Sequence, residues 1–224
     1  MSIKGAIFDM DGTLLDSMHI WWNLANMYVE SKGKVPEPGL KDKVWTLTMP
    51  EAAEYIKQRY EIEGETEEMV KEIYLLIENF YRQEVKARPG VRQVLEELWN
   101  AGIPMCVASA TDTYLVEYAL ERTGLRKYFG KIFCCREVGE GKGSDRIYQA
   151  ARESLGTLTE DTWVFEDALH AAQTAKAAGF PVVGIRDASE EGQDELKEIA
   201  DIYMEEYEQW PGIDNCKKPR SVLL

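Results

Sequence analysis

The sequence contains few of the residues that build zinc sites, disulfide frameworks and histidine-based catalytic triads. It has four cysteines and two histidines in 224 residues. The cysteines are Cys106, Cys134, Cys135 and Cys216. They form no CxxC pair and no Cys/His spacing, so we expect reduced, mostly buried thiols and no structural zinc. The histidines, His19 and His170, are too few and too scattered for a zinc site or a Ser-His-Asp triad, and we assign neither a role.

Long apolar runs and an excess of basic residues are also absent. The opening MSIKGAIFDMDG has only a four-residue apolar run before its first acid, shorter than that of a signal peptide, and no later stretch approaches a membrane span. The 26 basic and 40 acidic residues give a net charge of −14, which repels a nucleic-acid backbone or an anionic membrane at long range. We therefore expect a cytoplasmic protein with neither nucleic-acid nor membrane partners.

From residue 88 onward, short apolar runs alternate with segments of helical pattern. The runs are IPMCVAS (103–109), KIFCC (131–135), TWVFED (162–167), FPVVGI (180–185) and ADIYM (200–204). Such alternation is typical of a parallel sheet covered by helices on both faces. The earlier run KGAIFD (4–9) has the same character, and we expect it in the same sheet.

Residues 17–87 follow a different pattern, because no convincing strand appears and the apolar positions fall at helical spacing. In TEEMVKEIYLLIENFYRQEV (66–85) one apolar stripe comprises Met69, Val70, Ile73, Ile77, Phe80 and Tyr81. ARPG (87–90) then returns the chain to the alternating pattern. We predict a doubly wound parallel-sheet α/β core formed by residues 1–16 and 88–224, with an all-helical domain over residues 17–87 inserted after the first strand.

Three of the predicted strands end in side chains that carry oxygen. KGAIFD ends in Asp9, IPMCVAS ends in Ser109, and TWVFED ends in Glu166 and Asp167. Ligands of open parallel sheets bind outside the carboxyl ends of the strands. These side chains therefore mark the candidate site, and Asp11 lies two residues beyond Asp9.

Carboxylates gathered in this way favour a divalent cation, since they raise one another's pKa unless a positive charge neutralises them. Oxygen ligands without a nearby histidine or cysteine suit Mg²⁺, which also accepts phosphate oxygens. Lys142, in the loop that follows KIFCCREV, offers a further positive charge. The metal, this lysine and the hydroxyl of Ser109 together outline a phosphate pocket.

The same residues resemble the four motifs of the haloacid dehalogenase superfamily of phosphotransferases. DMDGTLLDS (9–17) is similar to its first motif, Ser109 in VASAT to its second, Lys142 in GKGSDRIY to its third, and Glu166-Asp167 to its fourth. The order and spacing of all four fit, and the resemblance covers nearly the whole chain. It implies a Rossmann-like core with a C1-type helical cap, as in the family's phosphatases and in beta-phosphoglucomutase.

The resemblance also implies catalytic and metal-binding roles for the acids. Asp9 would be the nucleophile that forms an aspartyl phosphate. Asp11 would protonate the leaving oxygen and later deprotonate the attacking water. Asp9, the backbone carbonyl of Asp11 and Asp167 would hold Mg²⁺, and Glu166 would bind the metal directly or support its ligands.

Phosphate binding falls to four residues in this comparison. Ser109 and the backbone amide of Ala110 would hold phosphoryl oxygens. Lys142 would shield the nucleophile from the charge of the incoming phosphate. Thr13 would position Asp11 or the phosphate.

The implied activity is Mg²⁺-dependent hydrolysis of a small-molecule phosphate monoester, such as a sugar phosphate. Dehalogenases of the family lack the second aspartate, which favours phosphoryl transfer here. TMPEAAEY (48–55) lacks the arginine with which beta-phosphoglucomutase grips a distal phosphate, which favours hydrolysis over mutase chemistry. A sugar phosphomutase and a non-catalytic phosphate-binding or regulatory protein stay open as alternatives, although the presence of both Asp9 and Asp11 speaks against the second.

Structural interpretations of the same residues stand beside the functional ones. Asp-Gly is a common turn signal, Ser109 fits a loop or helix-cap serine, and a lysine such as Lys142 is usually solvated. Of Trp21 and Trp22, one fits packing within the insertion and the other fits contact with substrate. We expect a small phosphorylated metabolite as the partner, and a monomer or weak homodimer.

Overall fold

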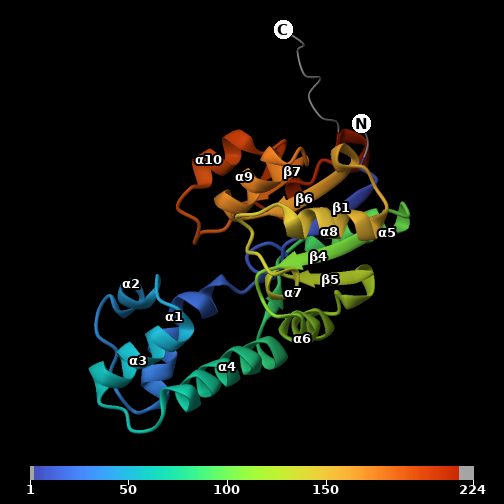
Figure 1. Ribbon diagram of the computed structural model, residues 1–224. Coiled ribbons are helices and arrows are strands. Elements are labelled where there is room, and N and C mark those ends of the chain that lie inside the picture. The colour runs from blue at the N-terminus through green and yellow to red at the C-terminus, as the bar shows by residue number, and fades with distance from the viewer. Residues whose placement is uncertain (1–2, 217–224) are drawn as a thin grey trace. The chain divides into compact units, whose positions relative to one another are not determined.

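The computed structural model describes residues 3–216, and the chain divides into two compact units (Figure 1). One unit is formed by the residues up to Asp16 and those from Val85 onward. The other, the helical unit, comprises Ser17–Glu84. Each unit is described separately below.

Within the described residues, the first unit contains a six-stranded sheet in the order β5-β4-β1-β6-β7-β8, in which all neighbours pair in parallel. The strands are β1 (Gly5–Phe8), β4 (Met105–Ser109), β5 (Lys131–Cys134), β6 (Thr162–Glu166), β7 (Val182–Ile185) and β8 (Ile202–Met204). Every one of them lies inside an apolar run from which a strand was predicted. The prediction of a parallel sheet is confirmed.

Helices cover the sheet, which explains why its strands are apolar on both faces. The α-helices of this unit are α5 (Val91–Asn100), α6 (Thr113–Thr123), α7 (Cys135–Val138), α8 (Arg146–Leu155), α9 (Leu169–Ala177) and α10 (Gln193–Ile199). Short 3₁₀ helices are η1 (Arg126–Tyr128), η2 (Thr159–Asp161), η3 (Tyr207–Gln209) and η4 (Ile213–Asn215). Helix α8 packs on β4, β1 and β5, while α9 packs on β6 and β7 (Figure 1).

Two aromatic and aliphatic layers form the core of this unit. Ile7 and Val164 belong to the cluster that α8 and α9 complete with Tyr148 and other buried side chains. Phe8, the next residue along β1, stacks on Phe165 with 4.1 Å between ring centroids. Because successive strand residues face opposite sides of a sheet, these neighbours anchor both layers and hold the central strands in register.

A small second sheet consists of β2 (Leu15–Asp16) and β3 (Lys86–Ala87), paired antiparallel where the chain leaves and re-enters the first unit. The expectation of no strand between residues 17 and 87 is therefore wrong at its last two positions. Two residues are too few for a hydrophobic period to form. Strand β3 forms by pairing with β2, and its own two residues show no sequence pattern that predicts a strand.

The helical unit contains α1 (Met18–Ser31), α2 (Leu40–Val44), α3 (Met49–Tyr60) and α4 (Thr66–Gln83). On α4 the predicted apolar stripe is buried except for Val70, which is partly exposed. Helix α3 begins with a capping box, in which the backbone N–H of Thr48 donates to Glu51 at 2.8 Å. Gly39, at φ 74°, allows the chain to turn into α2.

Two expectations from composition concern the thiols and the membrane. All four cysteines are free thiols within residues 3–216, with Cys135 half-buried and the others buried. Among the helices of the described chain, none is both long and apolar enough to cross a bilayer.

Candidate active site

The candidate site forms at the carboxyl ends of the three central strands. Asp9 directly follows β1, Ser109 is the last residue of β4, and Glu166 ends β6 with Asp167 next along the chain. Strand β1 lies between β4 and β6, and the chain continues outward from it in both directions. This is the switch point of the sheet, where the connections that leave toward opposite sides open a crevice for ligands.

The centre of the site is a cluster of buried carboxylates around one lysine. Asp9, Glu166 and Asp167 each place an oxygen within 4.8 Å of the others. The Nζ of Lys142 is ion-paired with Asp9 Oδ1 and lies 2.5 Å from Glu166 Oε1. Lys142 is only 8% exposed, so it is not the solvated surface lysine of the structural interpretation.

Burial controls the charge of these groups. It raises the pKa of Asp9 to about 7, where attraction to Lys142 opposes the effect and the charges of Glu166 and Asp11 add to it. Burial likewise raises the pKa of Asp167, with the charges of Asp9 and Glu166 adding. Burial disfavours the charged amine of Lys142, but its attraction to Asp9 and Glu166 prevails and raises its pKa above the ordinary value. Only when all three carboxylates are ionised, as ligands of a metal ion are, would the single charge of Lys142 leave the cluster two positive charges short of balance.

An independent observation indicates that this cluster of carboxylates suits a divalent cation. Glu166 Oε1 accepts hydrogen bonds from Lys142 and from the hydroxyl of Tyr148, whereas Oε2 is buried without a hydrogen-bond partner in residues 3–216. An unpartnered buried oxygen is costly, and a cation coordinated by this cluster would satisfy it. The donors are all oxygens, which suits Mg²⁺. Asp9, Glu166 and Asp167 would hold the ion, while the expected ligand role of the Asp11 carbonyl stays a prediction.

Asp11 is held by a residue that the sequence analysis missed. The hydroxyl of Thr111 donates to Asp11 Oδ2 at 2.7 Å, and its backbone N–H donates to Ser109 Oγ at 3.0 Å. Ser109 is buried, and Ala110 is exposed directly after β4. The sequence feature that could have identified Thr111 is its place two residues after the predicted phosphate-binding serine, just beyond the end of the same strand.

Thr13 contacts a different acid from the one expected. Its hydroxyl donates to Asp167 Oδ1 at 2.7 Å, whereas the sequence analysis assigned it to Asp11 or to the phosphate. The reason is the tight turn after β1, in which the backbone N–H groups of Leu14 and Leu15 both donate to the Met10 carbonyl. The turn places Thr13 beside the fourth motif, so its hydroxyl contacts Asp167, which is one of the expected metal ligands.

Gly12 makes that turn possible. Its φ of 81° is unfavourable for residues with a side chain. A Cβ at this position would also overlap the carboxylate of Asp167. The Asp-Gly pair is thus a turn, as the structural interpretation held, and at the same time the feature that lets the first and fourth motifs approach.

Two further residues of the site were not predicted. Tyr148, on α8, is buried and donates to Glu166 Oε1 at 2.8 Å. Arg88, from ARPG, donates to the Gly12 carbonyl at 2.6 Å and pairs with Asp187 at 3.2 Å. Tyr148 lies within the stretch GKGSDRIY and is the last residue of that motif, but its spacing gave no reason to place it in the site.

Neither histidine without an assigned role belongs to the acidic cluster of Asp9, Glu166 and Asp167. His19 belongs to the helical unit, where its ring meets Phe80 edge-on at 5.1 Å. His170 is exposed on α9.

An open parallel sheet whose carboxyl edge gathers aspartates, a buried lysine and an acidic cluster defines a Rossmann-like α/β protein with a candidate active site at that edge. The profile of the haloacid dehalogenase-like hydrolase family matches residues 6–185. The chain belongs to this family, which confirms the predicted family and fold class.

Relatives of this chain carry the names of phosphatases. It is 28% identical over 178 residues to the "Phosphorylated carbohydrates phosphatase" of Thermotoga maritima, covering 80% of this chain and 82% of the relative. It is 25% identical over 189 residues to the "Fructose-1-phosphate phosphatase YqaB" of Escherichia coli, covering 81% and 96%. The predicted enzyme class, a phosphatase of this family, is confirmed.

Solved structures show the same fold. A Thermotoga maritima protein assigned as a beta-phosphoglucomutase superposes with a TM-score of 0.81 at 26% identity, covering 92% of this chain and 96% of that one. CbbY from Rhodobacter sphaeroides, crystallised with phosphate, superposes with a TM-score of 0.73 at 22% identity, covering 95% and 98%.

Proposed function

We propose that this enzyme hydrolyses small phosphate monoesters with Mg²⁺, through a covalent phosphate on Asp9. The observation that carries the proposal is the buried ion pair of Lys142 with Asp9 and Glu166, directly beside Asp167. The proposed nucleophile Asp9, the positive charge of Lys142 and the candidate cation site thus lie together at the carboxyl edge of the sheet. Sugar phosphates are the first substrates to consider, because relatives are named for phosphorylated carbohydrates and for fructose 1-phosphate.

In the first half-reaction, a carboxylate oxygen of Asp9 attacks phosphorus while the bond to the leaving oxygen breaks. Asp11 donates its proton to that oxygen, and the alcohol departs. Lys142 stabilises negative charge on the phosphoryl group because its amine is already fixed beside Asp9. The hydroxyl of Ser109 and the backbone amide of Ala110 hold phosphoryl oxygens.

In the second half-reaction, water attacks the phosphorus of the aspartyl phosphate. Asp11 accepts a proton from this water, and the bond between phosphorus and Asp9 breaks to release inorganic phosphate. Thr111 keeps the same Asp11 oxygen oriented through both steps by its 2.7 Å hydrogen bond.

Bound Mg²⁺ would supply the positive charge that the acidic cluster lacks and would polarise a phosphoryl oxygen. Asp9, Asp167 and Glu166 would hold it. Thr13 and Tyr148 orient two of these carboxylates through their hydroxyl groups. The loss of hydrogen bonds that orient metal ligands usually lowers the affinity for the metal.

A phosphomutase is the second candidate, favoured by the likeness to the protein assigned as a beta-phosphoglucomutase. It would return the phosphoryl group from Asp9 to another substrate hydroxyl. The missing arginine in residues 48–55 favours hydrolysis. Product analysis separates the two, since hydrolysis yields free phosphate and a mutase yields an isomeric sugar phosphate.

The remaining expectations belong to the same proposal. We propose that the helical unit acts as the cap of this family, and that the enzyme is cytoplasmic and takes a small phosphorylated metabolite as its partner. A net charge of −14 supports the expectation of no nucleic-acid or membrane partner. We propose a monomer or weak homodimer.

The test is phosphate release from a panel of sugar, nucleotide and carboxylic-acid monophosphates with Mg²⁺. We expect turnover by the wild type and a loss of at least about a thousandfold in Asp9→Asn, since no other group forms the covalent intermediate. Asp194→Asn is the matched control, because Asp194 is exposed on α10. A folded wild type that binds phosphate esters but turns none over would leave the non-catalytic alternative standing.

A further inference from the structure

The turn after β1, residues 10–15, is held from outside by an arginine on the segment that returns the chain to the first unit. Arg88 Nη1 donates to the Gly12 carbonyl at 2.6 Å, and the backbone N–H of Arg88 donates to the Leu14 carbonyl at 3.0 Å. An ion pair with Asp187 at 3.2 Å fixes the guanidinium itself. Arg88 thus holds two carbonyl groups of this turn, and a different residue holds the carbonyl between them.

That residue is Tyr207, in the segment that follows β8. Its hydroxyl donates to the Thr13 carbonyl at 3.1 Å, and both residues are buried. Burial raises the pKa of Tyr207, against the opposing charge of Arg88, so the hydroxyl stays protonated and remains a donor. The family profile matches residues 6–185, so this contact to the first motif comes from a part of the chain beyond the matched residues.

Packing fixes the place of Tyr207. A Cβ on Gly90 would lie 2.8 Å from the Cβ of Tyr207, so the missing side chain of the glycine permits the close approach. Further along the same segment, the indole N–H of Trp210 donates to Glu97 on α5 at 2.9 Å. The ring centroid of Trp210 lies 5.7 Å from that of Phe165 on β6. These contacts anchor the segment to α5 and to the sheet and keep the hydroxyl of Tyr207 at the turn.

The carbonyl that Tyr207 holds belongs to the residue whose side chain reaches the acidic cluster. The Thr13 hydroxyl donates to Asp167 Oδ1 at 2.7 Å, and Asp167 lies beside Asp9 and Glu166. A rotation of the Thr13 backbone would move this hydroxyl and remove a constraint on the Asp167 carboxylate. Hydrogen bonds that orient a metal ligand contribute to the affinity for the metal.

We propose that Tyr207 is a positioning residue: its hydroxyl fixes the Thr13 backbone, so that the Thr13 side chain holds Asp167 in place as a ligand of Mg²⁺. Arg88 supports the same turn at the neighbouring carbonyl groups. The proposal deepens the proposed function and rests on it for the effect on turnover. The effect on magnesium binding is measured without substrate.

Tyr207→Phe removes the hydroxyl and keeps the ring beside Gly90. We expect magnesium, titrated by calorimetry without substrate, to bind this variant about fivefold more weakly than the wild type. We expect kcat to fall about tenfold with little change in KM. Tyr128→Phe is the matched control, because Tyr128 is 3% exposed in the same unit and its hydroxyl donates to Glu96 at 3.0 Å. This control should bind magnesium and turn over substrate like the wild type.

A double-mutant cycle shows whether Tyr207 acts through Thr13. Thr13→Val removes the hydroxyl that contacts Asp167 and should weaken magnesium binding about tenfold. Adding Tyr207→Phe to Thr13→Val should weaken it no further, because the group through which the tyrosine acts is already gone. A further loss as large as that of Tyr207→Phe alone would overturn the positioning role.

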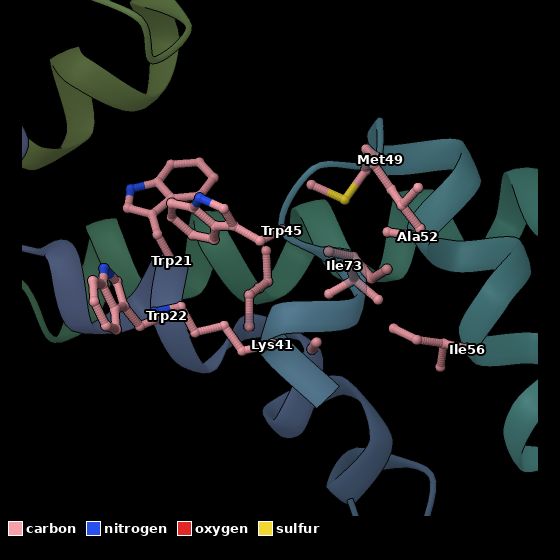
Figure 2. A pocket seen from close by; sticks show the side chains of 12 residues that line it. Trp21, Trp22, Lys41, Trp45, Met49, Ala52, Ile56 and Ile73 are labelled. Carbon is pink, nitrogen blue, oxygen red and sulfur yellow. The ribbon is translucent and has the colours of Figure 1, made fainter. Parts of the chain in front are cut away.

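Two other variants separate positioning from a general loss of stability. Arg88→Lys keeps the positive charge but loses the planar fork of donors, so it should also weaken magnesium binding. If Tyr207→Phe does not fold, Arg88→Lys takes its place in the cycle with Thr13→Val. Ile73→Val shortens a buried side chain on α4, where Ile73 lines the same cavity of the helical unit as Trp21 and Trp22 (Figure 2). This variant should be less stable and bind magnesium like the wild type.

Magnesium binding and turnover together separate this proposal from the proposed function. If no phosphate ester is hydrolysed but Tyr207→Phe weakens magnesium binding through Thr13, the positioning role stands and the proposed function falls. If phosphate esters are hydrolysed and Tyr207→Phe binds magnesium as tightly as the wild type, the positioning role falls and the proposed function stands. A wild type that binds no magnesium overturns both.

Discussion

The hydroxyl of Thr111 fixes one oxygen of the residue proposed as acid and base. It donates to Asp11 Oδ2 at 2.7 Å, and its loss would remove one constraint on the orientation of that carboxylate. A hydrogen bond to a charged group contributes about 1.5–3 kcal/mol. Proton transfer depends on geometry, so the loss should appear mainly in kcat.

Replacing Thr111 by valine removes the hydroxyl and keeps the branched shape. We expect kcat for phosphate release to fall at least about tenfold with little change in KM. Thr111→Ser restores the donor and should recover most of the rate. Thr113→Val is the control, because the Thr113 hydroxyl donates to Glu137 at 2.8 Å on the exposed start of α6. Equal rates in Thr111→Val and Thr111→Ser would exclude the positioning role.

At the scale of elements, the turn after β1 brings together the first and fourth motifs, which are more than 150 positions apart in the sequence. It depends on Gly12, whose φ is 81° and whose missing Cβ leaves room for Asp167. Backbone strain and steric overlap are separate consequences of adding a methyl group at this position. An alanine in place of Gly33 would cause only backbone strain, because φ is 70° there and no atom lies within 4 Å of the added Cβ.

Gly12→Ala should therefore lower kcat/KM at least about a hundredfold, since the carboxylate of Asp167 must move away from the site. Gly33→Ala should cost only about 1–2 kcal/mol of stability and leave activity unchanged. Chemical denaturation measures the stability of both variants, and phosphate release measures their activity. Full activity in a folded Gly12→Ala enzyme would mean that Asp167 is not required where the structure places it.

Glu37 connects the turn before α2 to two helices of the helical unit. Its carboxylate accepts hydrogen bonds from Arg59 and Tyr55 on α3 and pairs with Lys43 on α2 at 2.9 Å. Hydrogen bonding to Lys43, then to Arg59, lowers the pKa of Glu37 from 4.5 to about 2. Because the folded-state pKa lies below the unfolded one, the contribution is complete above pH 4.5 and is lost as the pH falls toward 2.

Glu37→Gln should accordingly have a lower thermal midpoint than the wild type at pH 7. The difference should shrink as the pH is lowered from 5 to 3, because Glu37 of the unfolded wild type takes up a proton in this range while Glu37 of the folded protein stays charged. Circular dichroism at a series of pH values measures it. A constant difference across this range would show that the effect of Glu37 comes from packing and not from its charge.

The regular elements were predictable from sequence, and several contacts within the site were not. Strands such as β1 and β6 are short apolar runs buried on both faces, and their carboxyl ends located Asp9, Glu166 and Asp167 without coordinates. The hydrogen bond from Thr13 to Asp167 was not predictable, since it depends on the conformation of the turn after β1. The pairing that creates β3 depends on segments about 70 positions apart, and no local pattern contains that information.

At the scale of the whole molecule, charge links folding to metal binding. The net charge of −14 draws cations to the surface in general, whereas the cluster of Asp9, Glu166 and Asp167 is buried and contains three acids for one lysine. A specifically bound ion stabilises the folded state according to its affinity and concentration. General screening of the surface depends only on ionic strength.

Magnesium at about a hundred times its dissociation constant should stabilise the protein by about 2.7 kcal/mol. For a chain of this size, that corresponds to a rise of about 5–10 °C in the thermal midpoint. Sodium at matched ionic strength should produce little of this rise, because it acts through screening. Asp167→Asn should lose the response to magnesium whatever its own midpoint, while Asp194→Asn on the exposed face of α10 should keep it. Equal responses to magnesium in these two variants would place the stabilising ion outside the acidic cluster and remove the basis for a metal-dependent mechanism.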